Sequence, residues 1–214
     1  MENKNNLEQS KYCYKNSDTL INKFDILDNM ELSKVERSLV LFRLTEMHLN
    51  NKLEFGFKID NYLEIHRYLF QDLYHFAGKI RDEEISKGTT LFCLKKYIYS
   101  NLKDTLLEMK KESNKVNKYE SLIEYLAYYY SYINIIHPFR EGNGRTLREY
   151  LRQNVFYLND INNLNFELDY SLVNEKVRKY LMDGSILSSL TGDIKVLKYF
   201  FESVLKEKDK QLIK

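Results

Sequence analysis

Proline and glycine, the residues that most often interrupt regular secondary structure, are scarce in this chain. Its 214 residues include one proline, Pro138, and seven glycines. Pro138, Gly142 and Gly144 lie within one stretch of seven residues, and helical patterns of apolar residues precede and follow it. A helix does not continue readily through proline, and glycine reaches backbone angles closed to other residues. The sequence therefore predicts a tight loop that leads into the N-terminus of a helix.

The composition excludes several classes of protein. Hydrophobic residues make up 43% and charged residues 30% of the chain, an ordinary globular balance. The net charge is +2 with acids and bases mixed, so we expect no nucleic-acid partner. No stretch approaches the roughly 18 apolar residues of a membrane span, and no signal peptide is recognisable. Two cysteines are too few for a disulfide scaffold. We predict a cytoplasmic protein with no membrane partner, unless a specialised secretion system exports it.

Hydrophobic periodicity predicts a mainly all-α fold. The most apolar stretch, 119–136, is interpreted as a central buried helix, and its tyrosines as core residues. Further helices are expected at 32–49, 60–73, 95–111, 144–158, 170–181 and 192–206. Residues 78–92 lose the helical period and contain β-branched residues around Gly88, which indicates a small β-hairpin or flap.

We predict one domain over residues 19–206. An irregular N-terminal segment, 1–18, precedes it, and a polar C-terminal tail, 207–214, follows it. No internal repeat, low-complexity segment or interdomain linker is recognisable in the sequence.

The segment from His137 to Arg148 combines groups that suit phosphate chemistry. Backbone N–H groups at a helix start have no intrahelical partner, and the helix dipole adds about half a positive charge there. The predicted loop is therefore an anion site. Arg145 and Arg148, three residues apart, project from the first turn on nearly one side and suit bidentate phosphate contacts. This exceeds the need of a single phosphate, so a di- or triphosphate is expected.

Glu141 and His137 add a metal ligand and a base to the same segment. A bare carboxylate would repel phosphate, whereas Mg²⁺ bound between the two makes the carboxylate a ligand. Histidine, with an ordinary pKa of about 6.5, accepts a proton from an attacking hydroxyl at neutral pH. Each residue alone is more often structural than functional. Their occurrence together within twelve residues predicts a catalytic site.

The same twelve residues resemble the signature of the Fic family, His-x-Phe-x-(Asp/Glu)-Gly-Asn-Gly-Arg-x-x-Arg. The eight fixed positions are filled by His137, Phe139, Glu141, Gly142, Asn143, Gly144, Arg145 and Arg148. Residues 65–70 and 85–88 resemble the family's helix before the flap and the flap itself. The resemblance implies a Fic fold, a helical bundle around the central helix with a hairpin flap.

The resemblance also implies an activity, the transfer of AMP from Mg-ATP to a Tyr, Thr or Ser hydroxyl of a target protein with release of pyrophosphate. It makes His137 the general base and Glu141 the Mg²⁺ ligand. The implied nucleotide-binding residues are Gly142, Asn143 and Gly144 as anion hole, Arg145 at the β-phosphate and Arg148 at the γ-phosphate. The implied target-docking flap residues are Ile85, Ser86, Lys87 and Gly88, which would accept an extended segment by strand pairing.

The donor stays open at this level. The alternatives are Fic-type transfer of UMP, GMP, phosphocholine or phosphate, and a non-catalytic nucleotide-binding scaffold. Gly144 argues against phosphate transfer, because relatives with that activity often lack the second glycine. His137 and Glu141 argue against a scaffold. The target protein and the oligomeric state are not fixed by the sequence.

The sequence lacks a complete copy of the inhibitory motif that many Fic proteins carry. The family's inhibitory helix carries (Ser/Thr)-x-x-x-Glu-(Gly/Asn), and here Ser171–Glu175 and Ser203–Glu207 have the spacing but are each followed by lysine. The pattern of Tyr12, Tyr14 and residues 20–23 resembles Fic proteins that are silenced by a separate small antitoxin. We therefore hypothesise inhibition by a separate protein.

Overall fold

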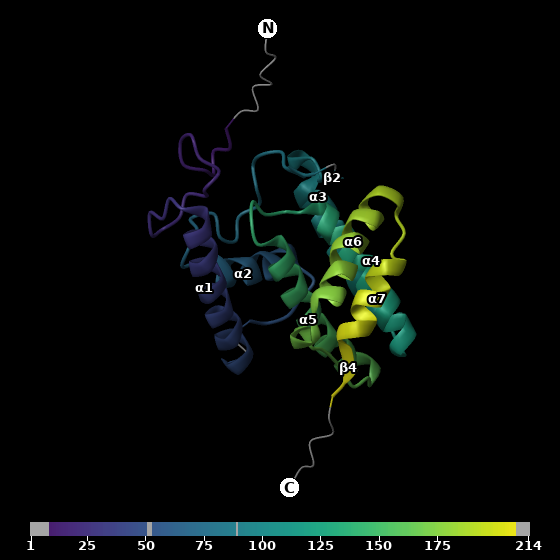
Figure 1. Ribbon diagram of the computed structural model, residues 1–214. Coiled ribbons are helices and arrows are strands. Elements are labelled where there is room, and N and C mark those ends of the chain that lie inside the picture. Colours follow the sequence, from purple (N-terminus) through teal and green to yellow (C-terminus); the bar gives the residue numbers. More distant parts are fainter. Residues whose placement is uncertain (1–8, 51–52, 89, 209–214) are drawn as a thin grey trace.

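The computed structural model describes residues 9–50, 53–88 and 90–208, and it is mainly helical, as predicted (Figure 1). The helices of this part are α1 (Asn29–Asn50), α2 (Ile59–Phe70), α3 (Ile98–Glu112), α4 (Tyr119–Ile136), α5 (Asn143–Asn162), α6 (Glu175–Thr191) and α7 (Lys195–Val204). Short 3-10 turns occupy Lys95–Tyr97, Ser113–Lys115 and Tyr170–Leu172. The strands are β1 (Ser86–Lys87), β2 (Thr90–Leu91), β3 (Phe166–Leu168) and β4 (Leu205–Glu207). Among the described helices, none is long and apolar enough to cross a membrane.

The helix α4 is the predicted central element. It contacts α3, α5, α6 and α7, and much of its surface is removed from water. Leu126 and Ala127 are fully buried, and Tyr125, Tyr129 and Tyr130 are buried core residues, as predicted. The prediction is wrong for Tyr132, which is exposed, and Tyr128 is only partly buried. Burial of such large side chains is the main stabilising contribution to a helical core.

The helix α5 joins the two halves of the bundle. It contacts α2 on one side and α4 on the other, and Figure 1 shows α1 and α2 on one side of it and α4, α6 and α7 on the other. The loop between α4 and α5 thus connects the two most central helices.

The helix α1 lies outermost and is attached through both apolar and polar contacts. Of its 22 residues only Leu32, Val40 and Met47 are buried. Arg43 makes a paired contact with Asp72 just beyond α2, at 2.6 and 2.7 Å. On the other side of α1, the apolar side chains of Leu41, Phe42 and Leu49 are exposed.

The predicted hairpin is present but short. β1 and β2 pair antiparallel, with Ser86 opposite Leu91, and the preceding residues 79–85 are irregular. Thr89, between the strands, lies outside the described residues.

The pairing of β3 with β4 was not predicted. Residues 205–207 leave the helical conformation expected up to residue 206, because Leu168 pairs with Leu205 and Phe166 with Glu207. Leu205 is buried by this pairing, which a local periodicity does not reveal. The domain limits at residues 18 and 206 stay predictions.

The helix expected at 170–181 is placed differently. Residues 170–172 form a 3-10 turn, and α6 begins after Asn174, whose side chain accepts from the Val177 N–H at 3.0 Å. The helix then continues through Gly184 to Thr191. A Cβ at Gly184 would lie 2.9 Å from the backbone nitrogen of Leu197, so this glycine allows α6 and α7 to pack closely.

We predict that Gly184→Ala destabilises the protein. Alanine in a helix is normally favoured over glycine by about 1 kcal/mol, but here the added methyl meets the backbone of α7. A net loss of about 1–3 kcal/mol is expected in urea unfolding, as for overpacked cores. Met182→Ala, at an exposed position of the same helix, is the control and should change stability by less than about 0.5 kcal/mol. A gain in stability for Gly184→Ala would contradict the packing described.

Candidate active site

The loop between α4 and α5 has the predicted form. α4 ends at Ile136, and His137 follows in the left-handed conformation (φ 47°), with its N–H bonded to the Ile133 carbonyl at 3.1 Å. Gly142, also left-handed (φ 82°), caps α5, which starts at Asn143. The loop therefore delivers the chain from one central helix directly to the N-terminus of the next.

Asn143 closes this loop from inside. Its side-chain oxygen accepts from the Phe139 N–H at 2.8 Å, and its side-chain nitrogen donates to the Phe139 carbonyl at 2.7 Å. The Phe139 ring is fully buried, and it stacks on the His66 ring with 3.7 Å between centroids. The Asn143 side chain is thus used within the loop, and its backbone N–H is the group that faces the proposed anion site.

His66 of α2 holds the loop through a hydrogen bond to its backbone. The sequence did not reveal this role. The Gly78 N–H donates to its Nδ1 at 2.8 Å, so its Nε2 carries the proton and donates to the Glu141 carbonyl at 2.9 Å. Burial lowers the pKa of His66 to about 3. The ring is therefore neutral, and it fixes the orientation of the peptide that links Glu141 to Gly142.

The two glycines of the loop have different surroundings. A Cβ at Gly142 would lie 2.3 Å from the ring of Phe70, and φ is positive there, so only glycine fits. A Cβ at Gly144 would lie 3.2 Å from Nη1 of Arg148. The first N–H groups of α5, from Asn143 to Arg145, have no intrahelical acceptor, which is the basis of an anion site.

His137 is held in one tautomer. Its Nδ1 lies 2.9 Å from the Asn134 carbonyl, which only accepts, so Nδ1 carries the proton and Nε2 keeps its lone pair. Burial is the largest cause that lowers its pKa, to about 4. The ring of Phe92, which follows β2, stacks on His137 with 3.8 Å between centroids. A neutral imidazole with a free Nε2 thus lies against the base of the flap.

Arg81 ties the flap to the loop. Its side chain is completely buried and donates to the carbonyls of His137 (2.8 Å), Glu83 (2.6 Å) and Cys93 (2.5 Å). Its own N–H bonds to the Pro138 carbonyl at 2.8 Å. One guanidinium thus binds the carbonyl of His137 in the loop and the carbonyls of Glu83 and Cys93, which lie before and after the hairpin. The sequence pattern did not single out this arginine, because its partners are backbone atoms and those of the loop, in His137 and Pro138, are distant in sequence.

The flap itself is open to solvent. Ser86, Lys87 and Gly88 are exposed, Ile85 is half-buried, and β1 pairs only with β2 within the described residues. Within the described residues, the outer edge of β1 is therefore unpaired.

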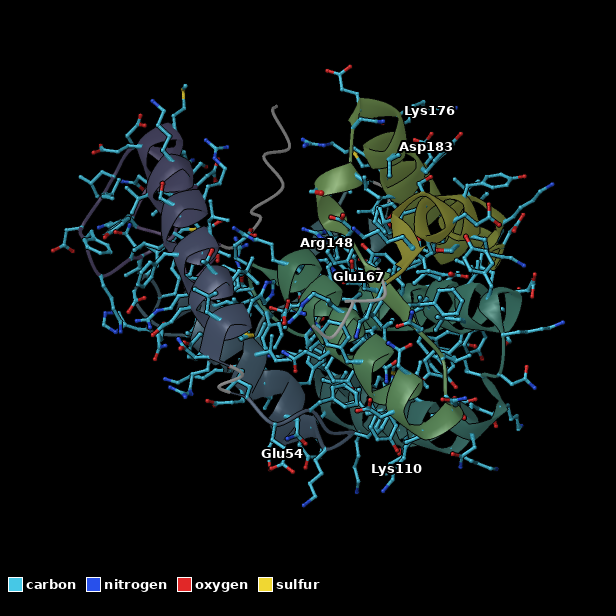
Figure 2. The ribbon with its side chains drawn as sticks, turned by 90° about the horizontal axis from the view of Figure 1, so that it is seen from below. Glu54, Lys110, Arg148, Glu167, Lys176 and Asp183 are labelled. Atoms are coloured by element: carbon cyan, nitrogen blue, oxygen red, sulfur yellow. The ribbon has the colours of Figure 1, made fainter. Side chains whose placement is uncertain are left out.

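The charged residues of the loop pair with one another and with α1. Nη2 of Arg145 lies 3.1 Å from Oε1 of Glu141 and 2.6 Å from Oε1 of Glu36. The Gly142 N–H also donates to Oε1 of Glu141, at 2.8 Å. Arg148 lies on α5 between α1 on one side and α6 on the other (Figure 2), and no carboxylate in the described part of the chain pairs with it. Glu36 was not identified from the sequence.

The described part of the protein alone does not offer enough ligands for a metal ion, so a bound nucleotide would have to supply some of them. Within the described residues, no cluster of three or more histidine, cysteine or acidic side chains is arranged to hold a metal ion. The one acid of the loop, Glu141, is partly exposed. A single accessible carboxylate fits a magnesium ion whose other ligands are phosphate oxygens and water, and does not fit a metal site built from protein alone.

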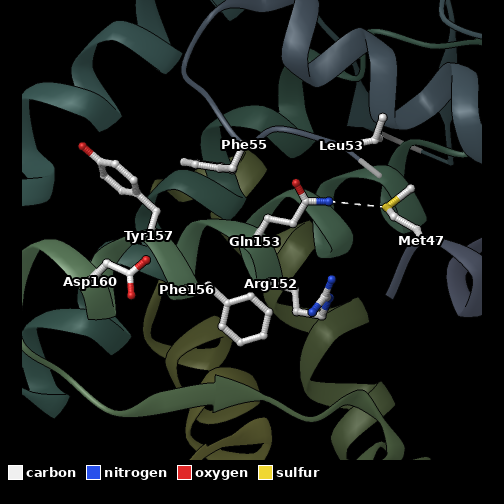
Figure 3. Close-up of a pocket in the computed structure, with 8 residues that line it drawn as sticks. All are labelled: Met47, Leu53, Phe55, Arg152, Gln153, Phe156, Tyr157 and Asp160. Atoms are coloured by element: carbon white, nitrogen blue, oxygen red, sulfur yellow. Dashed lines mark hydrogen bonds between the residues drawn. The ribbon is translucent and has the colours of Figure 1, made fainter. Parts of the chain in front are cut away.

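A cavity of about 260 Å³ lies away from this site (Figure 3). It is formed by the end of α1, residues 53–55 and the later turns of α5. Gln153 and Met47 meet in it, with 3.4 Å between Nε2 and Sδ. None of the loop residues lines it, so it is not part of the candidate active site.

Comparison with known proteins agrees with the predicted fold and with the resemblance to Fic proteins. Residues 56–153 match the model of the Fic/DOC family. A Sinorhizobium fredii protein named "Probable protein adenylyltransferase" is 29% identical over 88% of this chain and 92% of its own length. An Escherichia coli protein with a corresponding name is 27% identical over 92% of both chains. The protein adenylyltransferase VbhT of Bartonella schoenbuchensis is 32% identical over 63% of this chain and 28% of its own length.

Solved structures show the same fold. The BepC protein of Bartonella tribocorum, solved with bound AMPPNP, superposes with a TM-score of 0.78 at 21% identity, over 92% of this chain and 97% of that one. The fold of this chain is therefore the Fic fold. Residues 56–153 match the Fic/DOC family model, and the chain is similar to proteins named as adenylyltransferases over almost its whole length.

We predict that His137 stays neutral to unusually low pH. Its pKa in the folded protein is about 4, below the ordinary 6.5, because the ring is buried. In the free protein, an NMR titration of the imidazole nitrogens should show Nδ1 protonated and Nε2 unprotonated from pH 8 to about 5. A spectrum of His137→Asn assigns the signals. Half-protonation near pH 6.5, or a proton on Nε2, would contradict the geometry.

Proposed function

We propose that this chain is a protein adenylyltransferase that moves AMP from ATP to a hydroxyl side chain of another protein. Relatives that align with almost its whole length carry that name. The observation that carries the proposal is the state of His137: its Nε2 keeps its lone pair, and its ring stacks on Phe92, the residue that follows flap strand β2.

The proposed chemical step is a substitution at the α-phosphorus. The target's hydroxyl oxygen forms the new bond to phosphorus, its proton passes to Nε2 of His137, and the bond to the β-phosphate breaks to release pyrophosphate. The Nδ1–H contact with Asn134 fixes the tautomer, and it leaves the imidazolium that forms with one hydrogen bond already made.

We propose that the phosphates bind at the start of α5. The backbone N–H groups of Gly142, Asn143 and Gly144 form the anion hole, Arg145 contacts the β-phosphate and Arg148 the γ-phosphate. The free first-turn N–H groups and the absence of a carboxylate partner for Arg148 among the described residues support this assignment. Positive groups at the departing pyrophosphate lower the barrier, because charge develops there.

Glu141 is proposed to hold Mg²⁺ together with the phosphates. The ion, when bound, would neutralise phosphate charge and polarise the reacting phosphoryl group. On binding it, Glu141 would exchange its contact with Arg145 for the metal, which its partial exposure permits.

The flap residues Ile85, Ser86, Lys87 and Gly88 are proposed to dock the target. An extended target segment would add to the unpaired edge of the hairpin, so that main-chain hydrogen bonds hold it with little demand on its sequence. The Phe92–His137 stacking and the Arg81 contacts keep this edge in a fixed relation to the base.

Labelling in cell lysate tests the transfer. With Mg²⁺ present, the chain should transfer label to protein from α-³²P-ATP and not from γ-³²P-ATP, and His137→Ala should reduce labelling by at least about 10²-fold, as for loss of a general base. Label from γ-³²P-ATP would mean phosphate transfer. Labelling from UTP, GTP or CDP-choline alone would assign another donor, and nucleotide binding without any transfer would indicate a scaffold.

Inhibition is proposed to come from a separate protein. Glu175 lies exposed in the first turn of α6, and Glu207 is exposed in β4, where it pairs with Phe166. Neither forms an ion pair with Arg148. The exposed residues Leu41 and Phe42 of α1 leave an apolar surface on which a partner has room to bind.

We predict that the isolated chain is active and that Glu175→Gly and Glu207→Gly each leave its labelling rate unchanged. The reason is that neither carboxylate lies at the phosphate-binding arginines. The rates of the two variants and the native chain would be compared at equal concentration with α-³²P-ATP. An increase in either variant would place the inhibitor within the chain itself.

A further inference from the structure

The contacts of Arg145 all lie on one side of its guanidinium. Nη2 faces both Glu36 (2.6 Å) and Glu141 (3.1 Å). The guanidinium carbon lies 4.8 Å from the centre of the Phe70 ring. In the part of the chain that the structure describes, Nη1 and Nε donate no hydrogen bond. Nη2 of the planar guanidinium is therefore held by carboxylates, and Nη1 and Nε are available to donate hydrogen bonds to a ligand.

Glu36 is itself fixed in place. It comes from the second turn of α1, its side chain is 12% exposed, and it accepts a hydrogen bond from the hydroxyl of Tyr74. Tyr74 is buried, and burial, followed by the charge of Glu36, raises the pKa of its hydroxyl, which therefore stays protonated and donates. The chain of contacts runs from Tyr74 through Glu36 to Arg145.

We propose that Glu36 is a positioning residue, which holds Nη2 of Arg145 so that the Nη1 and Nε edge faces the nucleotide. This rests on the proposed role of Arg145 as a phosphate clamp. When Glu141 turns to the metal, Glu36 is the carboxylate that keeps Arg145 oriented. A carboxylate that competed with phosphate would instead occupy the fork through two parallel hydrogen bonds, and no such pair of hydrogen bonds links Glu36 to Arg145.

The assignment makes α1 a part of the nucleotide site. α1 lies outside residues 56–153, which match the family model, and it buries only three side chains. Its Glu36 nevertheless reaches a residue of the motif. The Arg43–Asp72 pair attaches α1 to the body independently of Arg145. This second attachment provides a matched control, because breaking it removes an ion pair of α1 while the contacts of Glu36 and Arg145 stay in place.

The test compares Glu36→Ala and Glu36→Gln with Asp72→Asn in the full chain. The rate of labelling from α-³²P-ATP in lysate is measured at several ATP concentrations. Glu36→Ala should lower the maximal rate by about tenfold or more, since misplacing a group at the leaving phosphate acts on the transition state. The half-saturating ATP concentration should change less than the rate. Glu36→Gln, which keeps an oxygen acceptor, should retain more activity, and Asp72→Asn should match the native chain.

A second readout does not depend on activity. In the NMR spectrum, the Nε–H signal of Arg145, assigned with Arg145→Lys, should be sharp in the native chain and in Asp72→Asn, and broadened in Glu36→Ala. An unchanged signal, a Glu36→Ala enzyme as fast as the native one, or an equal loss in Asp72→Asn would each overturn the inference.

The failure of the proposed function is distinguishable. If Arg145→Ala keeps the native labelling rate, the clamp assignment is wrong and the inference falls with it. If Arg145→Ala is inactive while Glu36→Ala is not, the clamp stands and only the role of Glu36 is wrong.

Discussion

The rest of the site depends on the backbone between His137 and Gly142, which two left-handed residues bend sharply between α4 and α5. Such a bend carries carbonyl and N–H groups that neither helix can pair, and buried backbone groups require partners. Three side chains provide them: Asn143 pairs with both backbone atoms of Phe139, Arg81 receives the His137 carbonyl, and His66 donates to the Glu141 carbonyl. The functional groups of the motif are presented by a loop whose own polar atoms are largely satisfied from below.

This division of labour explains the residue types of the motif. Phe139 and Asn143 are buried and hold the loop, and Gly142 is required because Phe70 fills the space of a Cβ. His137, Glu141 and the two arginines are only partly buried, and they keep free atoms or exchangeable contacts. A fixed loop backbone with available side chains is preorganised to bind a charged ligand, because the protein has to reorganise little when the ligand arrives.

Two elements outside the loop complete the site from distant parts of the chain. The flap is connected to His137 through Arg81 and Phe92, and α1 is connected to Arg145 through Glu36. Both are lightly built: the hairpin has strands of two residues, and α1 has a mostly exposed surface. Segments with few buried contacts open most readily. The target is thus proposed to dock on the flap, and a separate inhibitor on α1. Both parts of the fold are attached to the core through a small number of identified contacts.

The sequence by itself determined the helices α1 to α5, the hairpin and the loop, because periodicity, proline and glycine act through local backbone preferences. It also predicted which loop residues carry the chemistry, since these lie within twelve consecutive positions. Only the tertiary structure decided that residues 205–207 form a strand, because the strand with which they pair, β3, is distant in sequence. It also decided that α6 continues through Gly184, because this glycine is needed where α7 packs against α6. The same reason hid Arg81, His66 and Glu36. Each acts on atoms that come from another part of the chain, and no local pattern records such a contact.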